Sequence, residues 1–196
     1  MTVFSRPFSI CVYLGSKSGE GAKYTQLARE TGKQLAARNI TLVYGGGSIG
    51  LMGEVARAAL AENGRVIGII PEFLYQWEVG LDEVSELIKT DSMHERKTAM
   101  VDRSDAFLVL PGGIGTLDEL VEVITWAQLG MHRKPIVLVS LDDYWQPFET
   151  LINHMVSKSF ANSTTSDLYH VVGSLEEALR TIEINASEPQ ENVGDN

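Results

Sequence analysis

Residues 111–119 read Pro-Gly-Gly-Ile-Gly-Thr-Leu-Asp-Glu, and this stretch decides the predicted fold. It follows the apolar run 106–110, which is typical of a buried parallel strand, and it opens an apolar-periodic segment, 117–129, that predicts a helix. Its glycines allow backbone N–H groups to converge on one point, and the start of the helix adds partial positive charge there. The stretch therefore predicts a site for an anion, and specifically for a phosphate.

The same residues also permit a purely structural interpretation. Thr116-x-x-Glu119 matches a capping box, in which both side chains satisfy backbone amides at the helix start. A carboxylate near a bound sugar phosphate could instead stabilise a cationic transition state or transfer a proton. One carboxylate cannot fill both roles in one conformation, and the residues alone leave both open.

Length, composition and charge restrict the classes of protein. A chain of 196 residues with 44% hydrophobic residues predicts a single domain. A formal net charge of −10 argues against nucleic acid or an anionic membrane as partner, because both require a positive field. Cys11 is the only cysteine, which excludes an internal disulfide and predicts a cytoplasmic protein. Neither a signal-peptide pattern nor an apolar run long enough to span a membrane is found in the sequence.

Strand and helix patterns alternate along the chain. Strands are expected at 8–15, 41–44, 66–70, 86–89, 106–110, 135–140 and 169–172. Helices are expected at 22–39, after the glycine-rich turn 45–53 as far as about 62, from 91 onward, at 117–129, at 143–159 and from 174 to about 183. This order predicts a doubly wound, Rossmann-like α/β fold: a parallel sheet with helices on both faces. We expect one domain over 1–185, an acidic disordered tail over 186–196, and over 72–84 a loop that covers a site or a partner.

A second glycine-rich segment follows the strand expected at 41–44. Gly45-x-Gly47-x-x-Gly50, with Glu72 further along the chain, matches a dinucleotide-binding fingerprint. Pro71 separates the preceding strand from Glu72, and a second glycine turn lies elsewhere in the chain, so an NAD site is the weaker interpretation. Close packing of a helix against a strand is the alternative.

Two adjacent cations lie in the first turn of the helix expected from residue 91. Ser92-x-x-Glu95 predicts its capping box, and Arg96 and Lys97 follow directly, where the helix dipole disfavours positive charge. A planar guanidinium and a lysine suit a phosphate or carboxylate ligand, whereas a solvated surface pair is the structural alternative.

The remaining candidate groups predict no further chemistry. The four histidines lack the spacing of a metal site, and no serine lies in a nucleophile elbow. Tyr144, Trp145 and Phe148 have helical spacing, which predicts core or a dimer surface.

Four motifs in order resemble the LONELY GUY family of cytokinin riboside 5′-monophosphate phosphoribohydrolases, long labelled lysine decarboxylases. They are Gly-Gly-Gly-Ser-Ile-Gly-Leu-Met-Gly at 45–53, Met-His-Glu-Arg-Lys at 93–97, the stretch 111–119, and Thr-Trp-Ala-Gln-Leu-Gly at 125–130. The resemblance extends over about residues 8–183. It implies a homodimeric hydrolase, without cofactor or metal, that cleaves the N-glycosidic bond of a cytokinin riboside 5′-monophosphate or AMP to free base and ribose 5-phosphate. The alternative is a non-catalytic carrier of a phosphorylated, nucleotide-like cofactor.

The resemblance also implies roles for individual residues. Arg96 and Glu119 are the implied catalytic pair. The implied substrate-binding residues are Glu78, Lys97, Gly113, Ile114, Gly115, Thr116, Leu117, Asp118 and Thr125. We add Gly15, Ser16, Gly46, Gly47, Met93 and Gly112, because they lie on loops expected at the same rim of the sheet. The chain departs from the family at Asp118, where many members have glutamate, and at Ile114, where an aromatic residue is frequent. The sequence leaves the preferred N6 substituent open.

Overall fold

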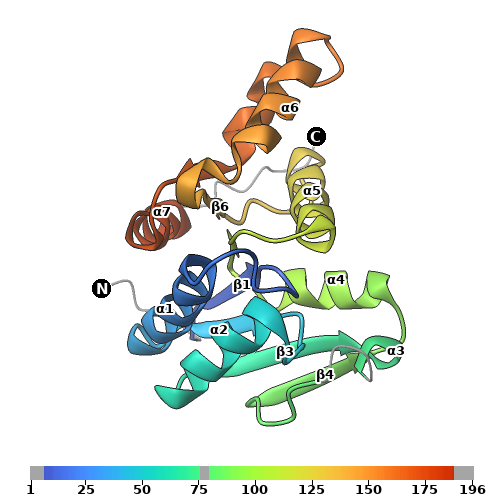
Figure 1. The fold of residues 1–196 in the computed structure, drawn as a ribbon. Helices are drawn as coiled ribbons and strands as arrows, with labels where there is room; N and C mark the ends of the chain where they lie inside the picture. Colours follow the sequence, from blue (N-terminus) through green and yellow to red (C-terminus); the bar gives the residue numbers. More distant parts are fainter. Residues whose placement is uncertain (1–6, 76–79, 188–196) are drawn as a thin grey trace.

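The protein forms a seven-stranded, entirely parallel sheet with helices on both faces (Figure 1). The computed structural model describes residues 7–75 and 80–187. The strands are β1 (Ser9–Tyr13), β2 (Thr41–Tyr44), β3 (Val66–Pro71), β4 (Glu86–Thr90), β5 (Ala106–Val109), β6 (Ile136–Val139) and β7 (His170–Val172). The predicted doubly wound, Rossmann-like sheet is confirmed.

The order of strands in the sheet creates a crevice at its centre. The order is β4-β3-β2-β1-β5-β6-β7, so the chain moves outward from β1 to β4 and then returns to the other side of β1. Connections leave β1 and β5 toward opposite faces, and doubly wound sheets bind ligands outside the carboxyl ends of two such strands. Val12 of β1 lies in register with Leu108 of β5, which brings the loops after these two strands together.

The two faces of the sheet are covered by different helices. The helices are α1 (Lys23–Ala37), α2 (Gly50–Ala61), α3 (Glu72–Tyr75), α4 (Met93–Asp102), α5 (Ile114–Gln128), α6 (Gln146–Ser157) and α7 (Leu175–Ser187). One core joins the sheet to α1, α2 and α7, and the other joins it to α4, α5 and α6. Both faces of every central strand are therefore buried, which explains why these strands appear in the sequence as continuous apolar runs. In Figure 1 the far end of α6 extends away from the sheet.

Helices α1 and α2 approach each other closely at a glycine. A Cβ atom on Gly32 would lie 2.3 Å from the carbonyl oxygen of Val55 and 2.8 Å from the amide nitrogen of Ala59. No real side chain tolerates such distances to backbone. Gly32, although a poor helix former, is the residue that lets α1 pack against α2.

Three segments differ from the prediction. Residues 72–75 form α3 instead of loop, while 76–79 lie outside the described residues. Helix α6 begins at Gln146, later than expected, because Asp142 and Asp143 adopt positive φ values of 51° and 58° within a 3₁₀ segment (Leu141–Asp143). Helix α7 continues to Ser187 and so includes the first two residues of the expected tail, while 188–196 are outside the described part. Within the described ranges, none of the helices has both the length and the apolar character of a membrane span.

Candidate active site

A cavity of about 430 Å³ opens at the carboxyl ends of β1 and β5. Its walls come from three places: the loop after β1 (14–19), the glycine turn after β5 (111–116), and side chains of flanking helices and loops. The flanking residues are Tyr24, Leu51, Met52, Arg96, Glu119 and Tyr144. The cavity therefore lies in the crevice where a doubly wound sheet binds its ligand.

The glycine turn leads directly into α5. Gly113 is the N-cap residue, and the helix begins at Ile114. A Cβ atom on Gly112 would lie 2.1 Å from the Thr116 hydroxyl oxygen and 2.8 Å from the amide nitrogen of Gly15, so only glycine fits there. The turn presents the unpaired amides of a helix start to the cavity, which is the arrangement that binds phosphate.

The predicted capping box at Thr116 is wrong. Because α5 begins at Ile114, Thr116 lies inside the first turn and is buried, and the N-cap is a glycine without a side-chain cap. Glu119 is consequently not a capping residue. It lines the cavity instead, one turn into the helix.

Arg96 reaches the cavity from α4, which lies on the same face of the sheet as α5. The predicted capping box of that helix is confirmed at Ser92, whose hydroxyl accepts a hydrogen bond from the Glu95 amide at 3.1 Å. Arg96 is only 5% exposed; its Nε donates to the Ile69 carbonyl at 3.2 Å and its Nη2 to the Gly45 carbonyl at 3.0 Å. The guanidinium is therefore fixed in place, and it shares the cavity wall with Glu119.

Lys97, the neighbour of Arg96, is directed elsewhere. Its Nζ forms ion pairs with Asp118 at 2.7 Å and with Glu122 at 3.5 Å. Partial burial lowers the pKa of Lys97, but the two carboxylates outweigh that effect and the pKa lies above its ordinary value. Thr125 lies further along α5, where its hydroxyl donates to the Val121 carbonyl at 2.7 Å.

The structure brings together about half of the residues expected to contact substrate. Those that line the cavity are Gly15, Ser16, Gly112, Gly113, Ile114, Gly115 and Thr116, together with Arg96 and Glu119. Those outside its lining are Gly46, Gly47, Met93, Lys97, Leu117, Asp118 and Thr125, while Glu78 lies outside the described residues. In the described chain this second set does not contribute to the wall of the cavity.

The glycines at 45–50 serve packing, so the dinucleotide interpretation is not supported. Gly46 has a φ of 77° and packs against Ile70, and Gly47 forms an isolated antiparallel bridge with Gly80. Glu72, the expected ribose-binding acid, forms an ion pair with Lys89 at 3.1 Å on the surface. Close helix–strand packing, the alternative from the sequence, explains this segment.

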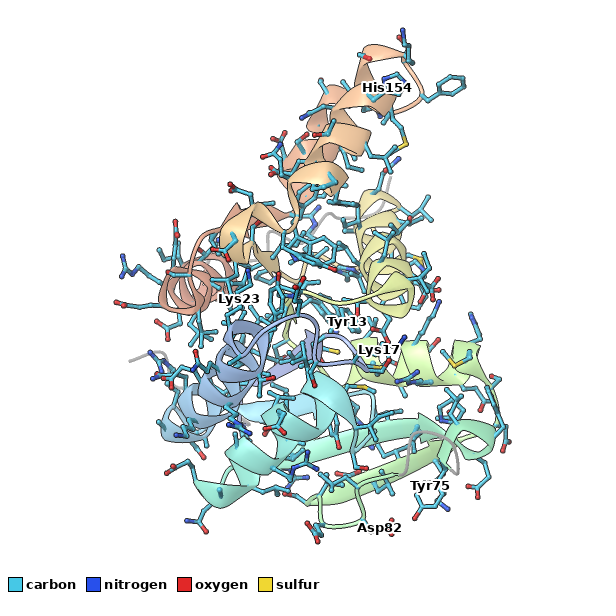
Figure 2. The ribbon with its side chains drawn as sticks, viewed as in Figure 1. Tyr13, Lys17, Lys23, Tyr75, Asp82 and His154 are labelled. Atoms are coloured by element: carbon cyan, nitrogen blue, oxygen red, sulfur yellow. The ribbon has the colours of Figure 1, made fainter. Side chains whose placement is uncertain are left out.

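Sequence reasoning missed several residues of the cavity wall, of which Lys17 and Tyr144 are the most polar. Figure 2 labels Lys17 on the loop beyond Tyr13, the last residue of β1. The Tyr144 hydroxyl donates to the Gly112 carbonyl at 2.5 Å, and its ring meets Tyr24 edge to face at 6.0 Å. Tyr144 is 37% exposed, so the expectation that it belongs to the core is wrong, whereas its place on a dimer surface stays a prediction. Its position in the sequence could have indicated Lys17, because the residue lies in the loop after the carboxyl end of the central strand β1.

Other candidate reactive groups lie apart from the cavity lining. Cys11 is fully buried in β1, and burial raises the pKa of its thiol far above the ordinary value. Residues 7–75 and 80–187 contain no group of three or more His, Cys, Asp and Glu side chains arranged to hold a metal.

The family model and the curated relatives indicate one family, and a solved structure shares the fold. Residues 52–182 match the family model described as "Possible lysine decarboxylase". A rice (Oryza sativa subsp. japonica) protein named cytokinin riboside 5′-monophosphate phosphoribohydrolase is 51% identical over 156 residues, which are 80% of this chain and 64% of that protein. An Arabidopsis thaliana protein of the same name is 42% identical over 183 residues, 93% of this chain and 86% of that protein. The Moco carrier protein from Chlamydomonas reinhardtii has the same fold, with a TM-score of 0.69 and 24% identity, over 92% of this chain and 98% of that one.

Proposed function

The chain belongs to the LONELY GUY family, and from that premise we propose that it is a cytokinin riboside 5′-monophosphate phosphoribohydrolase. The substrate is an adenosine 5′-monophosphate, with or without an N6 substituent, and the products are the free base and ribose 5-phosphate. One observation carries the proposal: Arg96 and Glu119 line the same cavity as the glycine turn.

The glycine turn suits the phosphate end of the substrate. Amides at the start of α5 and the dipole of that helix favour a negative group there. With the phosphate on residues 112–116, the ribose extends toward the part of the cavity lined by Glu119 and Arg96.

The reaction breaks the bond between the anomeric carbon of ribose and N9 of the base. The bonding electron pair leaves with the base, which takes up a proton, and the anomeric carbon becomes oxocarbenium-like until water adds to it. The carboxylate of Glu119 stabilises that positive charge and accepts the proton of the attacking water. Arg96, held by two carbonyl groups, supplies a fixed positive charge to the wall of the same cavity.

The description of the family model as a lysine decarboxylase does not suit this cavity. A pyridoxal phosphate enzyme requires a Schiff-base lysine together with a large cofactor site. The lysine that lines the described cavity, Lys17, is exposed, whereas desolvation is what activates a lysine of that kind.

The same proposal includes a cytoplasmic homodimer. Val121 on α5 and Leu129 at its C-cap are 45% and 69% exposed, and exposed apolar side chains that lie near one another suit a protein interface. A lone, buried cysteine fits a reducing compartment. Light scattering coupled to gel filtration tests the dimer, and a mass of one chain at micromolar concentration contradicts it.

Product analysis tests the activity. The purified protein is incubated with AMP and with a panel of N6-substituted adenosine 5′-monophosphates, and free base and ribose 5-phosphate are quantified by chromatography. We expect both products to appear in equal amounts. Saturable nucleotide binding without either product would instead identify a carrier.

A further inference from the structure

The cavity contains two cationic side chains, Arg96 and Lys17, and one carboxylate, that of Glu119. The substrate proposed above brings a phosphate that carries about −1.5 to −2 charges near pH 7. The whole chain has a formal net charge of −10, so it does not attract such an anion at long range. Binding of the phosphate therefore depends on cations in the cavity itself. The two candidates, Arg96 and Lys17, differ in whether their side chains can move to contact it.

Arg96 cannot move to follow a ligand. Its Nε and Nη2 donate to the carbonyl oxygens of Ile69 and Gly45, and both hydrogen bonds are buried. Movement of the guanidinium would break two hydrogen bonds from a charged donor, each worth about 1.5–3 kcal/mol. Arg96 thus acts as a fixed charge at one side of the cavity.

Lys97 is not available to the cavity either. Its ammonium group is paired with Asp118 and Glu122, and it does not contribute to the cavity wall. Of the two cations in the predicted Arg96–Lys97 pair, one is fixed and the other is neutralised.

Lys17 has the properties that the other cations lack. It lines the cavity and is exposed, and among the described residues it forms no ion pair. An ammonium group on a flexible stem with three donors can adjust to phosphate oxygens.

The loop that carries Lys17 is held in place on both sides. The Gly15 amide donates to the Pro111 carbonyl at 3.3 Å, and the Leu51 amide donates to the Gly15 carbonyl at 3.1 Å. Gly50, with a φ of 55°, lies so close to the backbone of Ser16 that a Cβ atom would be 2.2 Å from its carbonyl oxygen. The backbone of this loop is therefore fixed against the glycine turn, while the Lys17 side chain remains free to move.

We propose that Lys17 is a phosphate-binding residue that closes the cavity over the 5′-phosphate, opposite the amides of the glycine turn, and so selects nucleotides over nucleosides. The proposal rests on the function proposed above. Because this ion pair forms equally in the bound substrate and in the transition state, Lys17 affects substrate affinity and not the chemical step.

The test compares Lys17→Met with Lys33→Met. Lys33 is an exposed lysine of α1, so its replacement removes the same charge at a position outside the cavity. We expect Lys17→Met to raise KM for AMP about tenfold with kcat nearly unchanged, as for a lost charge-assisted hydrogen bond. We expect Lys33→Met to resemble the wild type, and Lys17→Arg to restore most of the affinity.

A binding experiment separates failure of this inference from failure of the proposed activity. Calorimetric titration with ribose 5-phosphate needs no turnover, and we expect Lys17→Met to weaken its Kd at least fivefold while Lys33→Met does not. An unchanged Kd in Lys17→Met overturns the inference even if the wild type hydrolyses AMP. A wild type that binds ribose 5-phosphate through Lys17 but releases no base overturns the activity alone. Equal melting temperatures of both variants show that the loop is intact.

Discussion

The hydroxyl of Tyr144 donates a 2.5 Å hydrogen bond to the carbonyl oxygen of Gly112, and so joins the segment after β6 to the glycine turn after β5. In a planar trans peptide, the direction of the Gly112 carbonyl also determines the direction of the Gly113 N–H. Tyr144 thus holds one peptide group of the turn in a single orientation.

Tyr144→Phe should lower kcat/KM for AMP about fivefold with little change in melting temperature. The ring contacts remain, and only one hydrogen bond, worth about 1 kcal/mol net, is lost. Steady-state kinetics measure the effect. Tyr75→Phe is the matched control, because it removes a 2.6 Å hydrogen bond to Asp82 outside the cavity lining. An identical kcat/KM for Tyr144→Phe and wild type would show that the turn keeps its geometry without the phenol.

Glu119→Gln should lose a factor of about 10² or more in kcat, because the amide can neither stabilise positive charge nor accept a proton. Nucleotide binding, measured by calorimetry, should stay within about threefold of wild type. Glu176→Gln on the surface of α7 controls for the loss of one carboxylate. A kcat for Glu119→Gln close to that of the wild type would show that Glu119 takes no part in catalysis.

Arg96→Met should reduce the free energy of unfolding by about 2–4 kcal/mol in addition to lowering activity. The substitution leaves the carbonyls of Gly45 and Ile69 without their donor, at about 1–3 kcal/mol each. Urea denaturation measures the loss. Arg180→Met breaks an exposed ion pair with Glu176 and should change stability by less than about 0.5 kcal/mol. Equal free energies of unfolding for the two variants would show that the hydrogen bonds from Arg96 to Gly45 and Ile69 do not stabilise the fold.

The stability of the wild type should fall below pH 6.5 because of His132. Burial lowers the pKa of this histidine, and its neutral ring uses both nitrogens: Nε2 donates to the Val123 carbonyl, and Nδ1 accepts from the Lys134 amide. Since the unfolded chain takes up a proton near pH 6.5 and the folded chain only at lower pH, the stability present above pH 6.5 is lost as pH falls through the folded pKa.

Thermal melts of wild type and His132→Gln between pH 8 and pH 5 test this titration. The non-titrating variant is less stable at pH 8, and the difference in melting temperature should shrink as the pH falls. His154→Gln on α6 gives the general effect of removing an imidazole from the surface. If the difference in melting temperature between wild type and His132→Gln is the same at every pH, the titration of His132 does not contribute to the pH dependence of stability.

The sheet could be predicted because its central strands are apolar at nearly every position. Each strand is buried on both faces, so its residues stand out as runs between turn signals, as in β5 (Ala106–Val109). The start of α5 could not be predicted from the same signals. Its N-cap residue, Gly113, lacks the polar side chain by which an N-cap is usually identified in a sequence. Thr116-x-x-Glu119 matches a capping box and therefore predicts a helix start at the wrong residue.

The site was predictable where it follows strands and not where it depends on tertiary packing. Gly15 and Gly112 directly follow β1 and β5, so parallel pairing alone places them together. Tyr144 follows β6 and reaches the cavity only because Asp142 and Asp143 turn the chain with positive φ, which the sequence pattern does not reveal. The resemblance placed Lys97 at the substrate together with Arg96, but adjacent residues on a helix point in different directions.

The amide of Ser9 donates to the carboxylate of Asp105, 96 positions further along the chain, and it secures the pairing of β1 with β5 from which the cavity is built. Protein synthesis proceeds at about 5–20 residues per second, so β5 is synthesised roughly 5–20 seconds after β1. Until then β1 exposes an unpaired edge, so the nascent chain is vulnerable to aggregation in that interval.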